Sequence, residues 1–178
     1  LFIGLLLIFG HNAFDGMRLT PADSGFGVWA FIMQSGFVPP GLIVPYALIP
    51  WLGIMLAGYG AGTLYTNEVD SSQRKKILFN AGLAAIILFI LIRAINIYGD
   101  PAPWAVQKNT LFTIMSFMNV TKYPVSLLFT LATLGPVLIV LSWLETSKNK
   151  AIETVSVYGR VPFFYYILHF YLIHAVAL

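Results

Sequence analysis

The first residues of this chain with the types and spacing for chemistry are His11, Asn12 and Asp15. If the preceding helix continues for one more turn, His11 and Asp15 lie four residues apart on the same face. A carboxylate beside an imidazole holds one tautomer and raises its basicity, as a general base requires. The alternative is a polar helix end in which Asn12 and Asp15 cap nearby amides, and the flanking Gly10 and Gly16 favour it.

A second polar cluster consists of Arg93, Asn96 and Asp100. These residues stand at positions i, i+3 and i+7, which share one face of a continued helix. Facing the interior of a helical bundle, they would form a charged stripe able to hydrogen-bond a substrate. The structural alternative places the Arg93 side chain at the membrane interface and Asp100 in a solvated loop.

Three further ionisable residues lie toward the end of the sequence: Arg160, His169 and His174. The guanidinium of Arg160 is suited to bind phosphate in a fork, or to anchor a helix at the interface. His169 and His174 are five residues apart, which turns them away from each other on a helix, so no shared metal ion is expected. Packing within a helix interface is the alternative role for His169. The sequence contains no cysteine, which excludes disulfides and thiolate nucleophiles within it.

The elements that must position these residues are strongly apolar. Hydrophobic residues make up 58% of the 178 residues and charged residues only 10%, whereas a typical soluble domain carries about 25% charged residues. Runs of about 20 apolar residues are long enough to cross a bilayer. We therefore predict an all-α, polytopic membrane protein, with residues 1–178 forming one transmembrane domain. The basic residues stand in loops beside apolar runs, which argues against nucleic-acid binding.

We expect about five membrane-spanning helices, in chain order: one that ends near Gly10, residues 44–65, residues 77–97, residues 123–144, and one that begins near Thr154. The first and last apolar runs reach the ends of the sequence, so we interpret the chain as the C-terminal part of a longer bundle. Residues 25–37 are apolar but too short to cross, which favours an interfacial or re-entrant element. Gly58 and Gly62 form a small-residue pair that would let a neighbouring helix approach closely.

The basic residues also predict the orientation of these helices. The two short loops, residues 67–76 and 145–153, carry five lysines and arginines, whereas the two longer connections carry three. Short loops rich in Lys and Arg remain on the cytoplasmic side of a membrane. The clusters around His11 and Arg93 would therefore lie together on the opposite side.

Five stretches, taken in order, cover nearly the whole chain: GHNAFDG (residues 10–16), YALIPWLGIMLAGYGAG (46–62), RAINIYGDPAPW (93–104), SFMNVTKYPVSLLFTLATLGP (116–136) and YGRVPFFYYILHFYLIH (158–174). In these stretches the chain resembles the bacterial DUF1624 proteins, relatives of the heparan-α-glucosaminide N-acetyltransferase family. The resemblance implies an acyltransferase of the bacterial inner membrane. Such an enzyme takes an acetyl group from acetyl-CoA in the cytosol and passes it to an amine or hydroxyl of a sugar-like acceptor across the membrane.

Within that scheme the candidate catalytic residues are His11 and Asp15, and Arg160 is the candidate residue for binding the acyl-CoA donor. The candidate acceptor-binding residues are Asn12, Arg93, Asn96, Asp100, Lys122, Tyr123 and His169. Two departures concern the site. The family's candidate catalytic histidine belongs to helices that precede residue 1. The sequence MQSG (residues 33–36) stands where relatives carry a His-x-Pro-Gly-like turn, so the identity of the acceptor is not carried over.

Two other functions fit the same residues. A transporter or flippase for a lipid-linked or small polar molecule would also contain kinked helices and buried Arg/Asp pairs. A structural subunit would contain no site at all. The sequence has no glycine-rich phosphate loop and no nucleophile elbow to decide among these functions.

Overall fold

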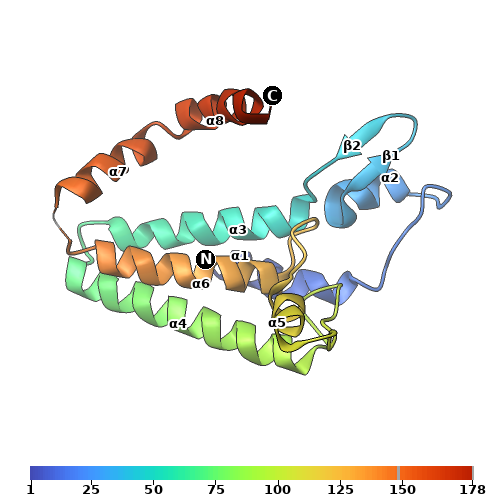
Figure 1. The fold of residues 1–178 in the computed structure, drawn as a ribbon, viewed down its shortest axis with the longest axis horizontal. Coiled ribbons are helices and arrows are strands. Elements are labelled where there is room, and N and C mark those ends of the chain that lie inside the picture. Colours follow the sequence, from blue (N-terminus) through green and yellow to red (C-terminus); the bar gives the residue numbers. More distant parts are fainter. Residues whose placement is uncertain (148, 178) are drawn as a thin grey trace.

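The fold is built on four helices that run side by side, with consecutive helices in opposite directions (Figure 1). The computed structural model describes residues 1–147 and 149–177. The four helices of this bundle are α1 (Phe2–Gly10), α3 (Leu48–Ala61), α4 (Ser71–Ile95) and α6 (Leu127–Leu144). The closest pairs are α4 with α6 and α1 with α3. A small core of Ile8, Phe89, Leu127, Leu128 and Leu131 joins α1, α4 and α6.

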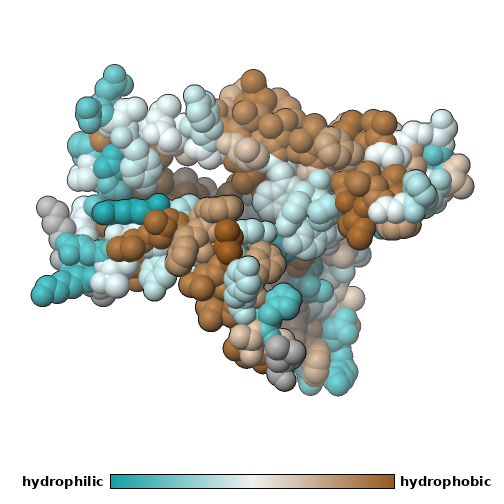
Figure 2. Space-filling view, turned by 90° about the horizontal axis from the view of Figure 1, so that it is seen from above, coloured by the Kyte–Doolittle hydropathy of each residue, from teal (hydrophilic) through white to brown (hydrophobic). Residues whose placement is uncertain are grey.

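Among the described residues, three segments are long and apolar enough to cross a membrane: Leu48–Tyr65, Ser71–Ile95 and Leu127–Leu144. The first of these includes a 3-10 turn, η3 (Gly62–Tyr65), that extends α3. Two further apolar segments, Phe2–Phe14 and Pro162–Ala177, are shorter. Hydrophobic residues cover much of the face shown in Figure 2, and hydrophilic residues gather at its left end. The predicted helical fold is thus confirmed in its main part, and three of the five expected spans have the length and composition to cross a membrane.

The chain after α6 departs most from its predicted course. A single span beginning near Thr154 was expected, but the structure has two helices, α7 (Lys150–Arg160) and α8 (Pro162–Ala177). Proline lacks an amide hydrogen and disfavours helical geometry in the residue before it. Val161 accordingly leaves the helical region, at φ −128° and ψ 50°. Both helices lie apart from the four-helix bundle (Figure 1).

Close contact between helices depends on glycines other than the predicted pair. A Cβ atom on Gly4 of α1 would lie 2.4 Å from the amide nitrogen of Ala57 in α3. A Cβ atom on Gly82 of α4 would lie 2.7 Å from the carbonyl oxygen of Gly135 in α6. Gly58 and Gly62 face open space, so the predicted role of that pair is wrong for the residues described.

The first long connection contains more regular structure than expected. It runs through η1 (His11–Phe14), α2 (Phe26–Trp29), a π-helical turn η2 (Ala30–Gln34) and two antiparallel strands, β1 (Gly36–Val38) and β2 (Leu42–Val44). Phe37 pairs with Ile43 across this hairpin. Residues 39–41, Pro-Pro-Gly, favour a tight turn between two short apolar strands. The hairpin departs from an all-α fold, and it makes α3 begin at Leu48 rather than at residue 44.

The two short loops meet at one end of the bundle. Nε of Arg74, at the start of α4, donates to Oε1 of Glu145 over 2.6 Å. Nζ of Lys75 donates to Oγ1 of Thr146 over 3.2 Å. The second long connection lies at the opposite end and contains an unexpected helix, α5 (Thr110–Met118), which Asn109 caps by accepting from the amide of Phe112. The structure therefore has a basic end and a second end that carries both polar clusters.

Candidate functional site

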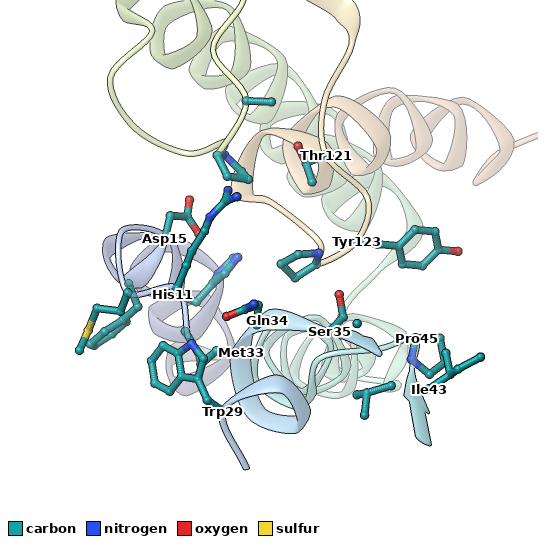
Figure 3. Close-up of a pocket in the computed structure, with 18 residues that line it drawn as sticks. His11, Asp15, Trp29, Met33, Gln34, Ser35, Ile43, Pro45, Thr121 and Tyr123 are labelled. Atoms are coloured by element: carbon teal, nitrogen blue, oxygen red, sulfur yellow. The ribbon is translucent and has the colours of Figure 1, made fainter. Parts of the chain in front are cut away.

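A cavity of about 770 Å³ occupies the end of the bundle opposite the basic loops (Figure 3). His11 and Asp15 lie on one side of it, Tyr123 and Pro45 on the other, and Gln34 and Ser35 between them. Its polar lining is His11, Asp15, Arg18, Gln34, Ser35 and Thr121. Its aromatic and sulfur-containing lining is Phe14, Met17, Trp29, Met33 and Tyr123.

A second cavity, of about 450 Å³, lies beside the first. Asp15, Arg18 and Pro101 line both cavities, so they form a shared wall. The smaller cavity is also lined by Asn12 and by the residues that follow α4, namely Asn96, Ile97, Tyr98, Gly99 and Asp100. The structure thus brings most of the predicted site residues to one end of the molecule, although it does not pair them as the sequence suggested.

His11 does not pair with Asp15. Its Nδ1 atom lies 3.0 Å from the carbonyl oxygen of Leu7, and its Nε2 atom lies 2.8 Å from the carbonyl oxygen of Val125. Carbonyl oxygens only accept hydrogen bonds, so the ring makes both bonds when both nitrogens carry a proton. The expected dyad fails because the chain tightens into the 3-10 turn η1 at His11, and residues four apart no longer share a face.

Asn12 continues the same connection between the end of α1 and the start of α6. Its Oδ1 atom accepts from the amide of Leu127 over 2.8 Å, and its Nδ2 atom donates to Oδ2 of Asp15 over 2.7 Å. Asn12 is buried, as is His11. Both residues therefore join the end of α1 to the start of α6, whereas the sequence suggested that Asn12 would cap a nearby amide.

Asp15 is the residue of this cluster that remains available for chemistry. Only one of its oxygens, Oδ2, has a hydrogen-bond partner in the described part of the chain. The side chain is half-buried and lies just outside the membrane-spanning segments. Burial raises the pKa of this carboxyl, and the hydrogen bond from Asn12 offsets part of that rise. A raised pKa makes the carboxylate a better proton acceptor near neutral pH.

Arg93 organises a loop and does not face a cavity. Its side chain is only 1% exposed, and its guanidinium donates to four backbone oxygens: Phe117 at 2.9 Å, Ala102 at 2.9 Å, Ser116 at 3.1 Å and Asn119 at 2.6 Å. Three of these carbonyls belong to the C-terminal end of α5, where helix carbonyls lack internal partners and a positive charge is favourable. The predicted interior stripe is therefore wrong for Arg93.

Asn96 and Asp100 do not continue the face of α4, because that helix ends at Ile95 and Asn96 takes a left-handed conformation with φ 59°. The Asn96 side chain exchanges two hydrogen bonds with the backbone of Trp104, at 2.9 and 3.0 Å. Both oxygens of Asp100 are used: they accept from the amide and hydroxyl of Thr121, the hydroxyl of Ser126 and the amide of Ala102, all within 2.9 Å. Both residues line the smaller cavity, but their hydrogen bonds mainly hold the second long connection in place.

Of the two neighbours Lys122 and Tyr123, Tyr123 lines a cavity and Lys122 does not. The Tyr123 ring lines the larger cavity at its far side and is directed away from His11 (Figure 3). It packs 5.9 Å from the ring of Tyr46. Lys122 places its ammonium 5.1 Å from the centre of the Tyr123 ring, and it lines neither of the two cavities.

Arg160 and His169 lie outside this region altogether. Arg160 is exposed at the end of α7, and it lines neither of the two cavities. His169 lies in α8 beside Tyr165, Tyr166 and Phe170 of the same helix, so the described residues do not place it in the interface between helices that was considered for it. The structure therefore brings neither residue to the site around Asp15.

Arg18, Trp29, Ser35 and Thr121 line the larger cavity but were not predicted as site residues. The sequence offered one signal, since residues 33–36 differ from the turn expected from the resemblance. Ser35 follows the π-helical turn η2 and has φ 55°, a backbone conformation that costs energy for any residue with a Cβ atom. Strained residues and π-helical turns both concentrate at functional sites.

In the described part of the chain, no three His, Asp or Glu side chains come close enough together to hold a metal ion. Comparison with family models, curated proteins and solved structures finds no match to this chain. The resemblance to DUF1624 proteins therefore stays a prediction.

Proposed function

We propose that this protein is a membrane-embedded acyltransferase whose sugar-like acceptor binds in the larger cavity. The observation that supports this proposal is the cavity itself. Its volume of about 770 Å³ falls within the range of about 300–1,000 Å³ typical of small-molecule sites. Its lining offers Gln34, Ser35 and Thr121 for hydroxyl groups and the indole of Trp29 for the apolar face of a sugar ring.

Asp15 is the proposed proton acceptor, in place of His11. Both ring nitrogens of His11 face carbonyl oxygens within 3.0 Å, whereas Asp15 retains an oxygen without a partner in the described structure and has a raised pKa. In the proposed reaction the acceptor nitrogen or oxygen bonds to the acyl carbon as the carbon–sulfur bond of the thioester breaks. Asp15 takes the acceptor's proton and releases it to the departing thiolate, which requires the thioester end of the donor to reach this cavity from the cytoplasmic side.

Acetyl-CoA remains the proposed donor on the resemblance alone. Arg160, its predicted binding residue, is exposed on α7 and lines neither cavity. The acceptor half of the reaction is therefore the part that rests on the geometry of this chain. Location in the bacterial inner membrane, with the acceptor cavity away from the cytoplasm, belongs to the same proposal.

A transporter or flippase receives less support. Like the acyltransferase, that function was expected to contain a buried Arg/Asp pair, for which Arg93 and Asp100 were the candidates. Instead, Arg93 binds four backbone carbonyls and Asp100 binds backbone and hydroxyl groups of the second long connection. Their polar atoms are therefore engaged within the protein.

Acetyl transfer from radiolabelled acetyl-CoA to glucosamine by the purified protein in detergent tests the proposal. We expect Asp15→Asn to lower the rate by about 100-fold or more, because a positioned general base contributes about 10²–10⁴-fold. Lys108→Ala, an exposed change at the same end of the molecule, is the matched control and should keep the rate. Wild-type protein that moves glucosamine into vesicles without acetylating it would instead establish transport.

A further inference from the structure

The wall between the two cavities carries one arginine, Arg18. Arg18 lines both cavities, is exposed, and forms no hydrogen bond or ion pair with any residue that the structure describes. The other ionisable groups that line the two cavities are either hydrogen-bonded within the protein or acidic. His11 is held by two carbonyls, and Asp100 accepts four hydrogen bonds. Arg18 is therefore the group of this wall best able to bind an anion.

Asp15 stands three residues before Arg18 in the same wall. A ligand that meets both side chains must offer a hydrogen-bond donor to the carboxylate and an anionic oxygen group to the guanidinium. The planar guanidinium presents five N–H donors in a fork that matches the oxygens of phosphate. An amine or hydroxyl at Asp15 and a phosphate at Arg18 would satisfy both groups, and the two adjacent cavities leave room on each side of the wall.

We propose that Arg18 determines acceptor specificity by selecting a phosphate-bearing acceptor. The group to be acylated occupies the larger cavity at Asp15, and the phosphate binds Arg18 at the shared wall. This inference rests on the proposed function, because it assigns the substrate class of the same site. Two sources offer this chemistry, a soluble amino-sugar phosphate and the headgroup of an aminophospholipid.

Calorimetric titration of the purified protein in detergent measures the discrimination directly. Glucosamine 6-phosphate is expected to bind about 10- to 100-fold more tightly than glucosamine, because hydrogen bonds to a charged group are among the stronger ones. Arg18→Ala should bring the ratio of the two affinities close to one, and Arg18→Lys should retain part of it. Lys108→Ala removes the same charge from an exposed site outside both cavities and should keep the wild-type ratio.

Vesicles separate the two sources. The protein is reconstituted in phosphatidylcholine alone or in phosphatidylcholine mixed with phosphatidylethanolamine. Phosphatidylcholine carries no hydrogen on its ammonium group, so only the second lipid offers both an amine proton and a phosphate. Weaker binding of glucosamine 6-phosphate in the mixed vesicles, lost in Arg18→Ala, would identify the lipid headgroup as the natural occupant. Equal binding in both vesicles would identify the soluble sugar phosphate.

The failures of the two proposals are distinguishable. Equal affinity of wild-type protein for glucosamine and glucosamine 6-phosphate, or a ratio that Arg18→Ala leaves unchanged, would overturn the role of Arg18 and leave the acyltransferase proposal standing. Absence of binding by both probes to protein that melts cooperatively would overturn the proposed acceptor site itself. Thermal melting of Arg18→Ala, whose side chain is exposed, checks that the variant folds.

Discussion

Asp15 is partly buried and has one oxygen without a partner among the described residues; its burial makes stability depend on pH. Burial raises its folded-state pKa above the ordinary value of 3.8. At pH values between the unfolded-state pKa and the raised folded-state pKa, the folded state binds more protons than the unfolded state. The ionisation of Asp15 therefore lowers stability as pH rises through this range. We predict that Asp15→Asn melts at a higher temperature than wild type at pH 7 in detergent. The difference should disappear below about pH 4, and a wild-type advantage at pH 7 would contradict it.

Ser35 combines a strained backbone conformation with a hydroxyl that lines the larger cavity. Its φ of 55° suits glycine, and relieving such strain is worth on the order of 1 kcal/mol. We predict that Ser35→Gly raises the free energy of unfolding by about 1 kcal/mol and weakens glucosamine binding by about 5- to 10-fold through loss of the hydroxyl. Ser35→Ala is the matched control, since it removes the hydroxyl and keeps the strain. Unchanged binding in both variants would show that the hydroxyl does not contact the acceptor.

At the scale of elements, Arg93 joins α4 to the connection that forms one wall of both cavities. A lysine cannot reach four carbonyls with one ammonium group, so Arg93→Lys leaves buried carbonyl oxygens without partners. We predict a loss of about 2–4 kcal/mol in the free energy of unfolding, measured by denaturant titration in detergent. Lys76→Met, an exposed change on the same helix, should cost less than about 0.5 kcal/mol. Equal effects of the two variants would refute this role of Arg93.

Elements whose structure depends on one dominant physical rule could be predicted from the sequence. Elements at which several effects compete could not. Long apolar runs determined α4 and α6, since few other structures bury them. The positions of Asn96 and His11 were predicted by extending helical periodicity, but α4 ends at Ile95 and η1 tightens at His11. Gly82 and Gly135 meet because α4 and α6 happen to cross there, which no local pattern reveals.

The candidate site was predicted in location more fully than in its contacts. His11, Asn12, Asp15 and Asp100 were selected because polar residues beside apolar runs are rare, and all four lie at the cavity end. Their pairing could not be predicted, since His11 binds Val125 and Asn12 binds Leu127, both more than a hundred residues away. Arg18 was not predicted as a site residue, because a single basic residue in a loop carries no sequence pattern that indicates binding.

At the scale of the whole molecule, the two ends of the bundle differ: one end carries the short basic loops, and the other carries the two cavities. Arg74 and Lys75 contact Glu145 and Thr146 at one end, and the cavities lie at the other. Basic loops resist translocation, so the end with Arg74 should face the cytoplasm and the cavity should open on the other side. An acceptor from outside the cytoplasm could then reach Asp15 without crossing the membrane.

Because residues 1–178 contain no cysteine, a single cysteine introduced among them reports this orientation without competing labelling from these residues. Ser72→Cys marks the basic end and Lys108→Cys marks the second long connection; both positions are exposed. We predict that a membrane-impermeant maleimide labels Lys108→Cys in intact cells, and labels Ser72→Cys only after the cells are permeabilised. The reverse pattern would place the acceptor cavity in the cytoplasm, where a soluble sugar phosphate made by the cell would reach Arg18 directly, and acylation would no longer involve two sides of the membrane.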